Sequence, residues 1–249
     1  DPLWSRGLGD VYKRQHLHGA SITMRQALAD YLDLAKARPD LFLTPGPGVR
    51  VLLDPADIAA VEQRCGQAYR DRGETPEAAQ VGLLVKDPWV YVLRDAVEFP
   101  DGHRATYTRV VNRYENGAAA LPLYQGKIVL IRHFRHPLRK SILEIPRGAI
   151  EAGDTPEEAV KRELMEEIGA QAVRVEPLGF LYGSTSLYGS GSHLFFAEIE
   201  NVGCPQIAEG VQAIEHYTVD EFEALLVEGQ ILDSFTVAAF AHSRLRKFL

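Results

Sequence analysis

GAIEAGDTPEEAVKRELMEEIGA, residues 148–170, is the most informative stretch of this sequence. Its second half is predicted to be a helix, because Thr155 can cap the first turn and Pro156 suits the first helical position. Glu158 completes a capping box with Thr155, and Gly169 is a stop signal. These signals together predict a short helix that follows a glycine-rich turn.

Three glutamates of this helix, Glu163, Glu166 and Glu167, fall on one face, because residues three and four apart are neighbours on a helix. Two unit charges about 4 Å apart repel each other by on the order of 4 kcal/mol at an effective dielectric of roughly 20. A hard divalent cation removes that cost, and oxygen ligands suit Mg²⁺ or Mn²⁺. The pattern therefore predicts a metal site, with a solvated acidic helix face as the alternative.

The glycine, the arginine and the glutamates also match a known motif. The stretch resembles the Nudix box, in which a glycine precedes a helix with the order Arg-Glu, an apolar residue, any residue, Glu-Glu, any residue and Gly. The matching positions are Gly148, Arg162, Glu163, Leu164, Glu166, Glu167, Gly169 and Ala170. Asp154 stands where the motif has its first glutamate. A motif with this many fixed positions is a specific signal.

The resemblance covers the chain from about Trp89 to its C-terminus, and it extends to the ADP-ribose pyrophosphatase-like branch. It implies an α/β (α+β) Nudix fold, a mixed curved sheet sandwiched between helices. In that branch a substrate-facing arginine ends the strand before the box, where Arg135 stands here. The carbonyl before the box glycine is a metal ligand of the branch; here it belongs to Arg147, where the branch usually has Ala. In that branch, a glutamate in the loop ahead of a later strand helps to activate the attacking water. Glu209 is the best positional match for it in this sequence, and Glu215 is the second.

The resemblance implies a metal-dependent enzyme that hydrolyses the diphosphate bond of a nucleoside diphosphate derivative. Mg²⁺ or Mn²⁺ would be held by Glu163, Glu166, Glu167 and the carbonyl of Arg147, while Arg162 would orient the carboxylates. ADP-ribose, giving AMP and ribose 5-phosphate, is the leading substrate. The alternatives are nucleotide sugars such as UDP-glucose or GDP-mannose, and dinucleoside polyphosphates. A non-catalytic nucleotide-sensing Nudix module is an alternative of another class.

Two arginines lie at the end of the apolar strand KIVLIRHF and just after it. Strand alternation places Arg135 on the side of Val129 and Ile131, and Arg132 on the opposite side. A buried cation needs an anionic partner, so both arginines are candidates for a substrate phosphate, or for pairing with surface acids. Tyr188, in the Gly/Ser-rich loop after the box, is a candidate for stacking on a base, or a partly buried aromatic.

The chain is expected to divide into three segments. Residues 1–20 are expected to be a non-native or disordered leader, and residues 21–86 an N-terminal helical extension for packing, dimerisation or covering the active site. Residues 87–249 would form the Nudix hydrolase domain. Within that domain, β-rich stretches on either side of a Pro-Asp-Gly turn at residues 100–102 predict a hairpin.

Composition narrows the class of protein. A hydrophobic content of 46% and a charged content of 24% in 249 residues are those of a globular protein. A net charge of −7 argues against nonspecific nucleic-acid binding, and no apolar run approaches the roughly 18 to 20 residues that span a membrane. Cys65 and Cys204 lack metal-type spacing, which favours a cytoplasmic protein. A small-molecule nucleotide is the expected ligand, and a homodimer the expected assembly.

Overall fold

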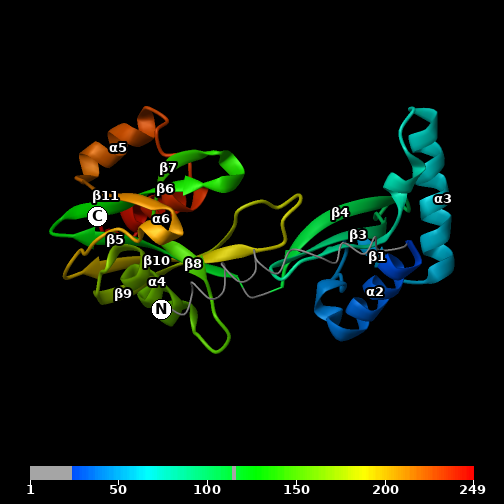
Figure 1. Ribbon diagram of the computed structural model, residues 1–249, viewed down its shortest axis with the longest axis horizontal. Helices are drawn as coiled ribbons and strands as arrows, with labels where there is room; N and C mark the ends of the chain where they lie inside the picture. The colour runs from blue at the N-terminus through cyan, green and yellow to red at the C-terminus, as the bar shows by residue number, and fades with distance from the viewer. Residues whose placement is uncertain (1–23, 114–115) are drawn as a thin grey trace. The chain divides into compact units, whose positions relative to one another are not determined.

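The computed structural model describes residues 24–113 and 116–249, which form two compact units (Figure 1). The first unit holds the described residues up to Leu84 together with Leu93–Thr108, and the second holds Val85–Val92 and Arg109–Leu249. The first unit thus takes in part of the predicted hairpin as well as the N-terminal helices. The leader expected over residues 1–20 lies outside the described residues.

Two helices and a four-stranded sheet account for the N-terminal part of the described chain. The elements are α2 (Met24–Ala37), η1 (Pro39–Leu41), β1 (Arg50–Leu52), α3 (Pro55–Asp71), η2 (Pro76–Ala79), β2 (Gly82–Lys86), β3 (Val90–Glu98) and β4 (Arg104–Asn112). The strand order is β1-β3-β2, and β4 also pairs with β3, which confirms the predicted hairpin. The buried Tyr31 hydroxyl donates a hydrogen bond to Asp95 at 2.6 Å and so attaches α2 to β3.

The second unit is built on a seven-stranded sheet. Its strands are β5 (Gly117–Tyr124), β6 (Lys127–Arg135), β7 (Lys140–Glu144), β8 (Arg147–Ala149), β9 (Ala172–Tyr182), β10 (Gly191–Ile199) and β11 (Val211–Tyr217). The order is β11-β6-β5-β10-β9, with β7 paired to β6 and β8 to β5. Strands β10 and β5 are parallel and the other pairs are antiparallel. The predicted mixed sheet is therefore confirmed.

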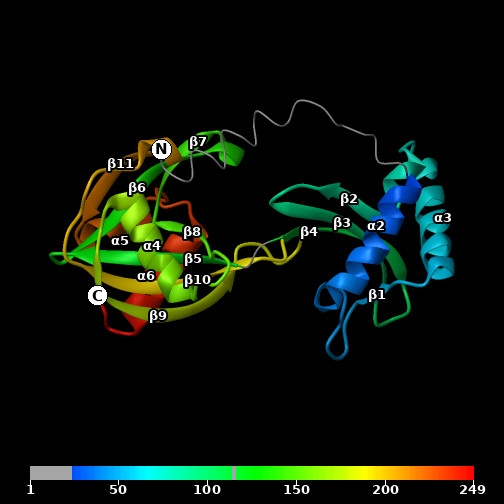
Figure 2. The same cartoon turned by 60° about the horizontal axis from the view of Figure 1, so that its bottom comes forward.

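Helices cover both faces of this sheet (Figures 1 and 2). They are α4 (Pro156–Ile168) on one face, and α5 (Val219–Val227) and α6 (Ser234–Leu245) on the other; η3 (His136–Leu138) and η4 (Ile207–Glu209) are short connections. Ala118 of β5 packs in one core cluster with Leu164 of α4. Its neighbour Ala119 packs in the other cluster with Phe222 and Phe240. The alternation of a strand thus supplies both cores, and the sandwich is confirmed.

The register of β6 and β7 determines which charged side chains face α4. Ile131 pairs with Glu144, and His133 pairs with Ile142, so their side chains share the face that packs on α4. Among the described residues, none of the helices is long and apolar enough to cross a membrane.

Candidate active site

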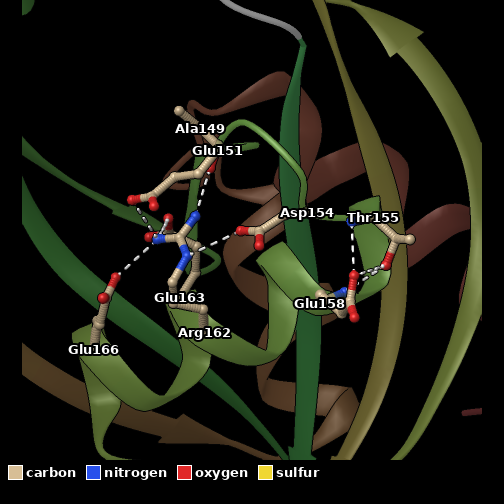
Figure 3. Close-up of polar contacts among 8 residues, drawn as sticks. All are labelled: Ala149, Glu151, Asp154, Thr155, Glu158, Arg162, Glu163 and Glu166. Atoms are coloured by element: carbon tan, nitrogen blue, oxygen red, sulfur yellow. Dashed lines mark hydrogen bonds and ion pairs between the residues drawn. The ribbon is translucent and has the colours of Figure 1, made fainter.

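Helix α4 begins and ends where the sequence predicts. The Thr155 hydroxyl accepts a hydrogen bond from the Glu158 amide at 3.2 Å, and the Glu158 carboxylate accepts one from the Thr155 amide at 2.8 Å (Figure 3). Gly169 has a φ of 60°, the left-handed conformation that glycine adopts at low cost at a helix end. The helix that carries the three glutamates is therefore held at both termini by local contacts.

Gly148 lies directly against the carboxylate of Glu163. A Cβ atom at residue 148 would lie 2.1 Å from Oε1 and 2.2 Å from Cδ of Glu163, far inside van der Waals contact. The Glu163 residue is only 7% exposed, so its carboxylate packs against this glycine inside the protein. The box glycine therefore permits a close approach between β8 and α4 that any other residue would obstruct.

Arg162 is the centre of the acidic cluster on α4 (Figure 3). Its guanidinium donates to Glu163 Oε1 at 2.8 Å and to Glu166 Oε2 at 3.0 Å. It also donates to the backbone carbonyl of Ala149 at 2.7 Å and to Asp154 at 3.4 Å. Arg162 thus holds the carboxylates of Glu163 and Glu166 as the sequence predicts. It also contacts Asp154, the residue that stands where the motif has its first glutamate.

Glu167 is a buried carboxylate, only 2% exposed. Its Oε2 accepts a hydrogen bond from the backbone amide of Arg147 at 2.9 Å. Burial, with a further contribution from the charge of Glu163, raises the pKa of Glu167 to about 8 from its ordinary value of 4.5. In the absence of a cation, this carboxylate therefore carries a proton over much of the neutral range.

The donor set suits a hard divalent cation, but its members do not surround one position. Carboxylate and carbonyl oxygens are the ligands that magnesium and manganese prefer. Across residues 24–113 and 116–249, no group of three or more His, Cys, Asp or Glu side chains is arranged to hold a metal ion. The Arg162 guanidinium instead lies between Glu163 and Glu166 and offsets their charge. Metal binding by Glu163, Glu166, Glu167 and the Arg147 carbonyl stays a prediction.

Glu144, which the sequence analysis did not select, is the centre of a second cluster. Its side chain is fully buried, with Arg135 Nη2 at 2.6 Å, Arg147 Nη2 at 3.0 Å and His133 Nδ1 at 3.1 Å. The Arg135 contact is an ion pair whose geometry does not meet that of a hydrogen bond. Burial raises the pKa of Glu144, but the contacts with His133, Arg135 and Arg147 outweigh it, so the pKa lies below its ordinary value. A lone carboxylate in the apolar segment ILEIP was the signal for this residue.

The side chain of Arg147 is held on three sides. It donates to Glu144 Oε2, and its Nη1 lies 3.3 Å from Asp233 Oδ1 at the N-cap of α6. Its guanidinium carbon lies 5.3 Å from the centre of the Phe235 ring, a cation–π distance. The long cation that replaces the alanine of the family is thus fixed between a strand and a helix.

A cavity of about 350 Å³ adjoins both clusters. Its wall includes Arg135, Arg147, Gly148, Ala149, Tyr188 and Phe235. Gly148 belongs to this wall and also contacts Glu163, so the cavity meets the acidic helix at that residue. The hydroxyl of Tyr188 donates to Asn112 and the residue is 37% exposed. Arg135 and Tyr188, two of the predicted substrate-binding residues, therefore lie at one cavity.

Arg132 and the two candidate bases lie elsewhere or are not described. Arg132 Nε donates to Glu215 Oε1 at 2.6 Å, and Glu215 also accepts from the Tyr217 hydroxyl. The alternation of β6 places Arg132 on the face opposite Arg135, and it is not part of the cavity wall. Glu209 ends η4, and its side chain lies outside the described part of the structure.

Comparisons with known proteins agree with this architecture. The NUDIX domain model matches residues 113–235. A protein of Bacillus methanolicus named methanol dehydrogenase activator is 34% identical over 189 residues, which cover 74% of this chain and 98% of that protein. An ADP-ribose pyrophosphatase of Bacillus subtilis (strain 168) is 30% identical over 158 residues, which cover 61% of this chain and 84% of that protein. A solved structure of an ADP compounds hydrolase has the same fold, with a TM-score of 0.59 at 22% identity, covering 67% of this chain and 90% of that one. The chain therefore belongs to the Nudix hydrolase family.

Proposed function

We propose that this chain hydrolyses the diphosphate bond of a nucleoside diphosphate derivative, with ADP-ribose as the best candidate substrate. The observation that carries the proposal is the junction at Gly148, where a cavity with Arg135 and Arg147 in its wall meets the buried carboxylate of Glu163. A diphosphate needs cationic groups along its length and a site for a divalent cation at the reacting phosphorus. The cavity wall supplies the cationic groups, and the carboxylates of α4 are the proposed site for the divalent cation.

A divalent cation is expected to be required, as it generally is for Nudix hydrolases. Glu163, Glu166, Glu167 and the carbonyl of Arg147 are the proposed ligands. The chemistry supplied by a bound cation is neutralisation of the diphosphate charge and a more acidic water. Arg162 would keep the carboxylates oriented, and Glu209 is the proposed acceptor of the proton from the attacking water.

ADP-ribose is favoured over other derivatives by the relatives. The Bacillus subtilis relative is named an ADP-ribose pyrophosphatase and matches over 84% of its own length. The products would be AMP and ribose 5-phosphate. UDP-glucose, GDP-mannose and dinucleoside polyphosphates are the competing substrates, because the arginine contacts recognise the diphosphate and carry no information about the group attached to it.

A panel assay tests the proposal. The purified full chain would be incubated with ADP-ribose, UDP-glucose, GDP-mannose and a dinucleoside polyphosphate, each with Mg²⁺, Mn²⁺ or EDTA, and the products separated by chromatography. We expect AMP and ribose 5-phosphate from ADP-ribose, only with metal, and at a higher kcat/KM than for the other compounds. Glu163→Gln is the matched inactive variant, because glutamine keeps the shape of the side chain against Gly148. Failure of the wild type to cleave any compound with either metal would refute the hydrolase.

A second candidate function is regulation of another protein by a nucleotide-binding Nudix module. One specific observation favours it: the Bacillus methanolicus relative, which matches over 98% of its length, is named an activator of an enzyme. In that case calorimetry would detect nucleotide binding while the panel assay gave no metal-dependent product. The two functions are compatible if the chain both cleaves the nucleotide and acts on a partner.

We further propose a cytoplasmic homodimer. Both cysteines of the chain, Cys65 and Cys204, are unpaired, which is consistent with a reducing compartment. Light scattering coupled to size-exclusion chromatography would distinguish a dimer from a monomer of 27.6 kDa. Fractionation of cells that express the native gene would test the location.

A further inference from the structure

The Arg147 side chain has no place in the reaction as proposed so far. Only its backbone carbonyl is assigned, and a carbonyl does not require any particular side chain. Yet the guanidinium is fixed by Glu144, Asp233 and Phe235 and forms part of the cavity wall. These three contacts hold the guanidinium in a fixed position at the cavity.

One buried carboxylate sets the spacing of two cations. Glu144 Oε1 faces Arg135 Nη2 at 2.6 Å, and its other oxygen, Oε2, faces Arg147 Nη2 at 3.0 Å. The carboxylate is fully buried, whereas the side chains of Arg135 and Arg147 are 26% and 22% exposed. The guanidinium groups are therefore tied together behind the wall and partly accessible from the cavity side.

The cations keep donors for a ligand. A guanidinium offers five N–H groups, and the contacts with Glu144 and Asp233 engage two of them on Arg147. Arg135 Nε is buried and lacks a hydrogen-bond partner within the described residues. Nε and Nη2 of Arg135 are both closed off from solvent, which leaves Nη1 as the guanidinium nitrogen that a ligand in the cavity could reach.

The two arginines of this wall have two carboxylate partners, Glu144 and Asp233. Glu144 is shared by Arg135 and Arg147, and so offsets only one of the two positive charges. Asp233 offsets the other through Arg147, and its Oδ2 accepts from the amide and hydroxyl of Thr236 in the first turn of α6, which fixes the aspartate in place. An anion at this wall therefore meets two fixed guanidinium groups at little cost in side-chain ordering.

We propose that the Arg147 side chain, together with Arg135, binds the two phosphates of a nucleoside diphosphate group, one arginine to each phosphate, and so determines the preference for diphosphate over monophosphate ligands. A monophosphate would engage one guanidinium and leave the other unsatisfied. The inference rests on the proposed function, because it assigns a further contact to the same substrate. It concerns a side chain in which this chain departs from the alanine typical of the branch.

Two substitutions at residue 147 and one matched control test the inference. Arg147→Ala removes the guanidinium but keeps the backbone amide and carbonyl, and Glu144 keeps Arg135 and His133 as partners. Arg147→Gln removes only the charge and keeps a side chain that can contact Glu144 and Phe235. The control is Arg174→Ala: Arg174 is also bound by two carboxylates, Glu176 and Glu198 at 3.0 Å each, and lies 5.2 Å from the ring centre of Phe248, but it is not in the cavity wall.

Calorimetric titration with ADP and with AMP, in Mg²⁺ buffer and with the nucleotides checked for integrity, measures the preference directly. We expect the wild type to bind ADP more tightly than AMP, and both Arg147 variants to lose about tenfold in ADP affinity while AMP affinity changes by less than about twofold. Arg174→Ala should retain the wild-type ratio. Thermal unfolding of every variant verifies that the fold is intact.

Kinetics on the diphosphate substrate separate binding from chemistry. KM is expected to rise about tenfold in Arg147→Ala, with kcat within about twofold of the wild type, because a ground-state contact is lost. An ADP to AMP affinity ratio that is the same in the wild type and in both folded Arg147 variants would overturn the inference. Absence of turnover in the wild type would instead refute the proposed hydrolase, and the affinity ratio could still be measured.

Discussion

Two arginine–carboxylate clusters in the second unit have opposite compositions. On α4, one arginine, Arg162, serves Glu163 and Glu166 and leaves an excess of negative charge. On β7 and β8, one carboxylate, Glu144, lies between Arg135 and Arg147, and Asp233 is a second partner of Arg147. The first cluster presents carboxylates, the groups that bind metal ions, and the second presents partly exposed guanidinium groups, which can donate to a phosphate.

In the proposed function, one small region accepts both a cation and an anion. The clusters meet at Gly148, which contacts Glu163 and belongs to the cavity wall. In each cluster a side chain of one charge holds two side chains of the opposite charge, although the carboxylates of α4 do not surround one position. Changes at one cluster should therefore affect chemistry, while changes at the other should affect binding or stability.

The largest effect is expected from breaking the acidic cluster at Glu167. Glu167→Gln removes the carboxylate that is buried beside Glu163 and should reduce metal-dependent turnover by about a thousandfold, because charge neutralisation dominates this chemistry. The fold should remain intact, since glutamine can still accept the hydrogen bond from the Arg147 amide. Initial rates with Mg²⁺ and circular dichroism measure the two quantities. Wild-type turnover in this variant would remove Glu167 from the site.

A smaller loss is expected where the two clusters meet. Gly148→Ala places a Cβ atom 2.1 Å from Glu163 Oε1, so the carboxylate must move while the backbone can stay. A misplacement of this size costs about a hundredfold in turnover, and stability should change little because the displaced atoms end a flexible side chain. Gly153→Ala would be a poor control, because Gly153 has a φ of 98°, which strains the backbone of any residue with a side chain. Gly189→Ala is the better control, because its Cβ would meet nothing closer than 3.7 Å.

The cluster around Glu144 is expected to contribute to the stability of the fold. Glu144→Gln leaves two partly buried guanidinium groups without their shared carboxylate and is expected to lower the free energy of unfolding by about 2 kcal/mol. Glu176→Gln, at an exposed pair with Arg174, should change it by less than about 0.5 kcal/mol. Urea denaturation compares the two variants. Equal stabilities would mean that Glu144 does not organise the arginines.

In the absence of metal, the free energy of unfolding is expected to fall gradually as pH rises, because of Glu167. The pKa of Glu167 is raised to about 8 in the folded protein from 4.5, so the folded state keeps a proton that the unfolded chain releases between these values. This contribution to stability is complete below pH 4.5 and is lost as pH rises through about 8. Urea denaturation at a series of pH values in EDTA should show the decline. The decline should be absent in Glu167→Gln, and its persistence there would assign it to another group.

The sequence determined the features that depend on residues close together in the chain. Thr155, Glu158 and Gly169 predict the limits of α4, which the structure confirms. The spacing of its glutamates predicts a common face; Glu163 and Glu167 are buried, whereas Glu166 is exposed. Strand alternation likewise predicts that Arg135 and Arg132 lie on opposite faces. The family resemblance adds the sandwich, which the structure confirms.

Only the tertiary structure decided how the charges are shared. That Glu144 would bind Arg135 depends on the register of β7 on β6, and that Arg147 would reach Asp233 depends on where the N-cap of α6 lies. Arg132 had the same residue type and nearly the same position as Arg135, yet its partner is Glu215 on another strand. Local pattern specifies which face a side chain takes, whereas its partner comes from elements far apart in sequence, so packing and register had to be known before the basic half of the site could be identified.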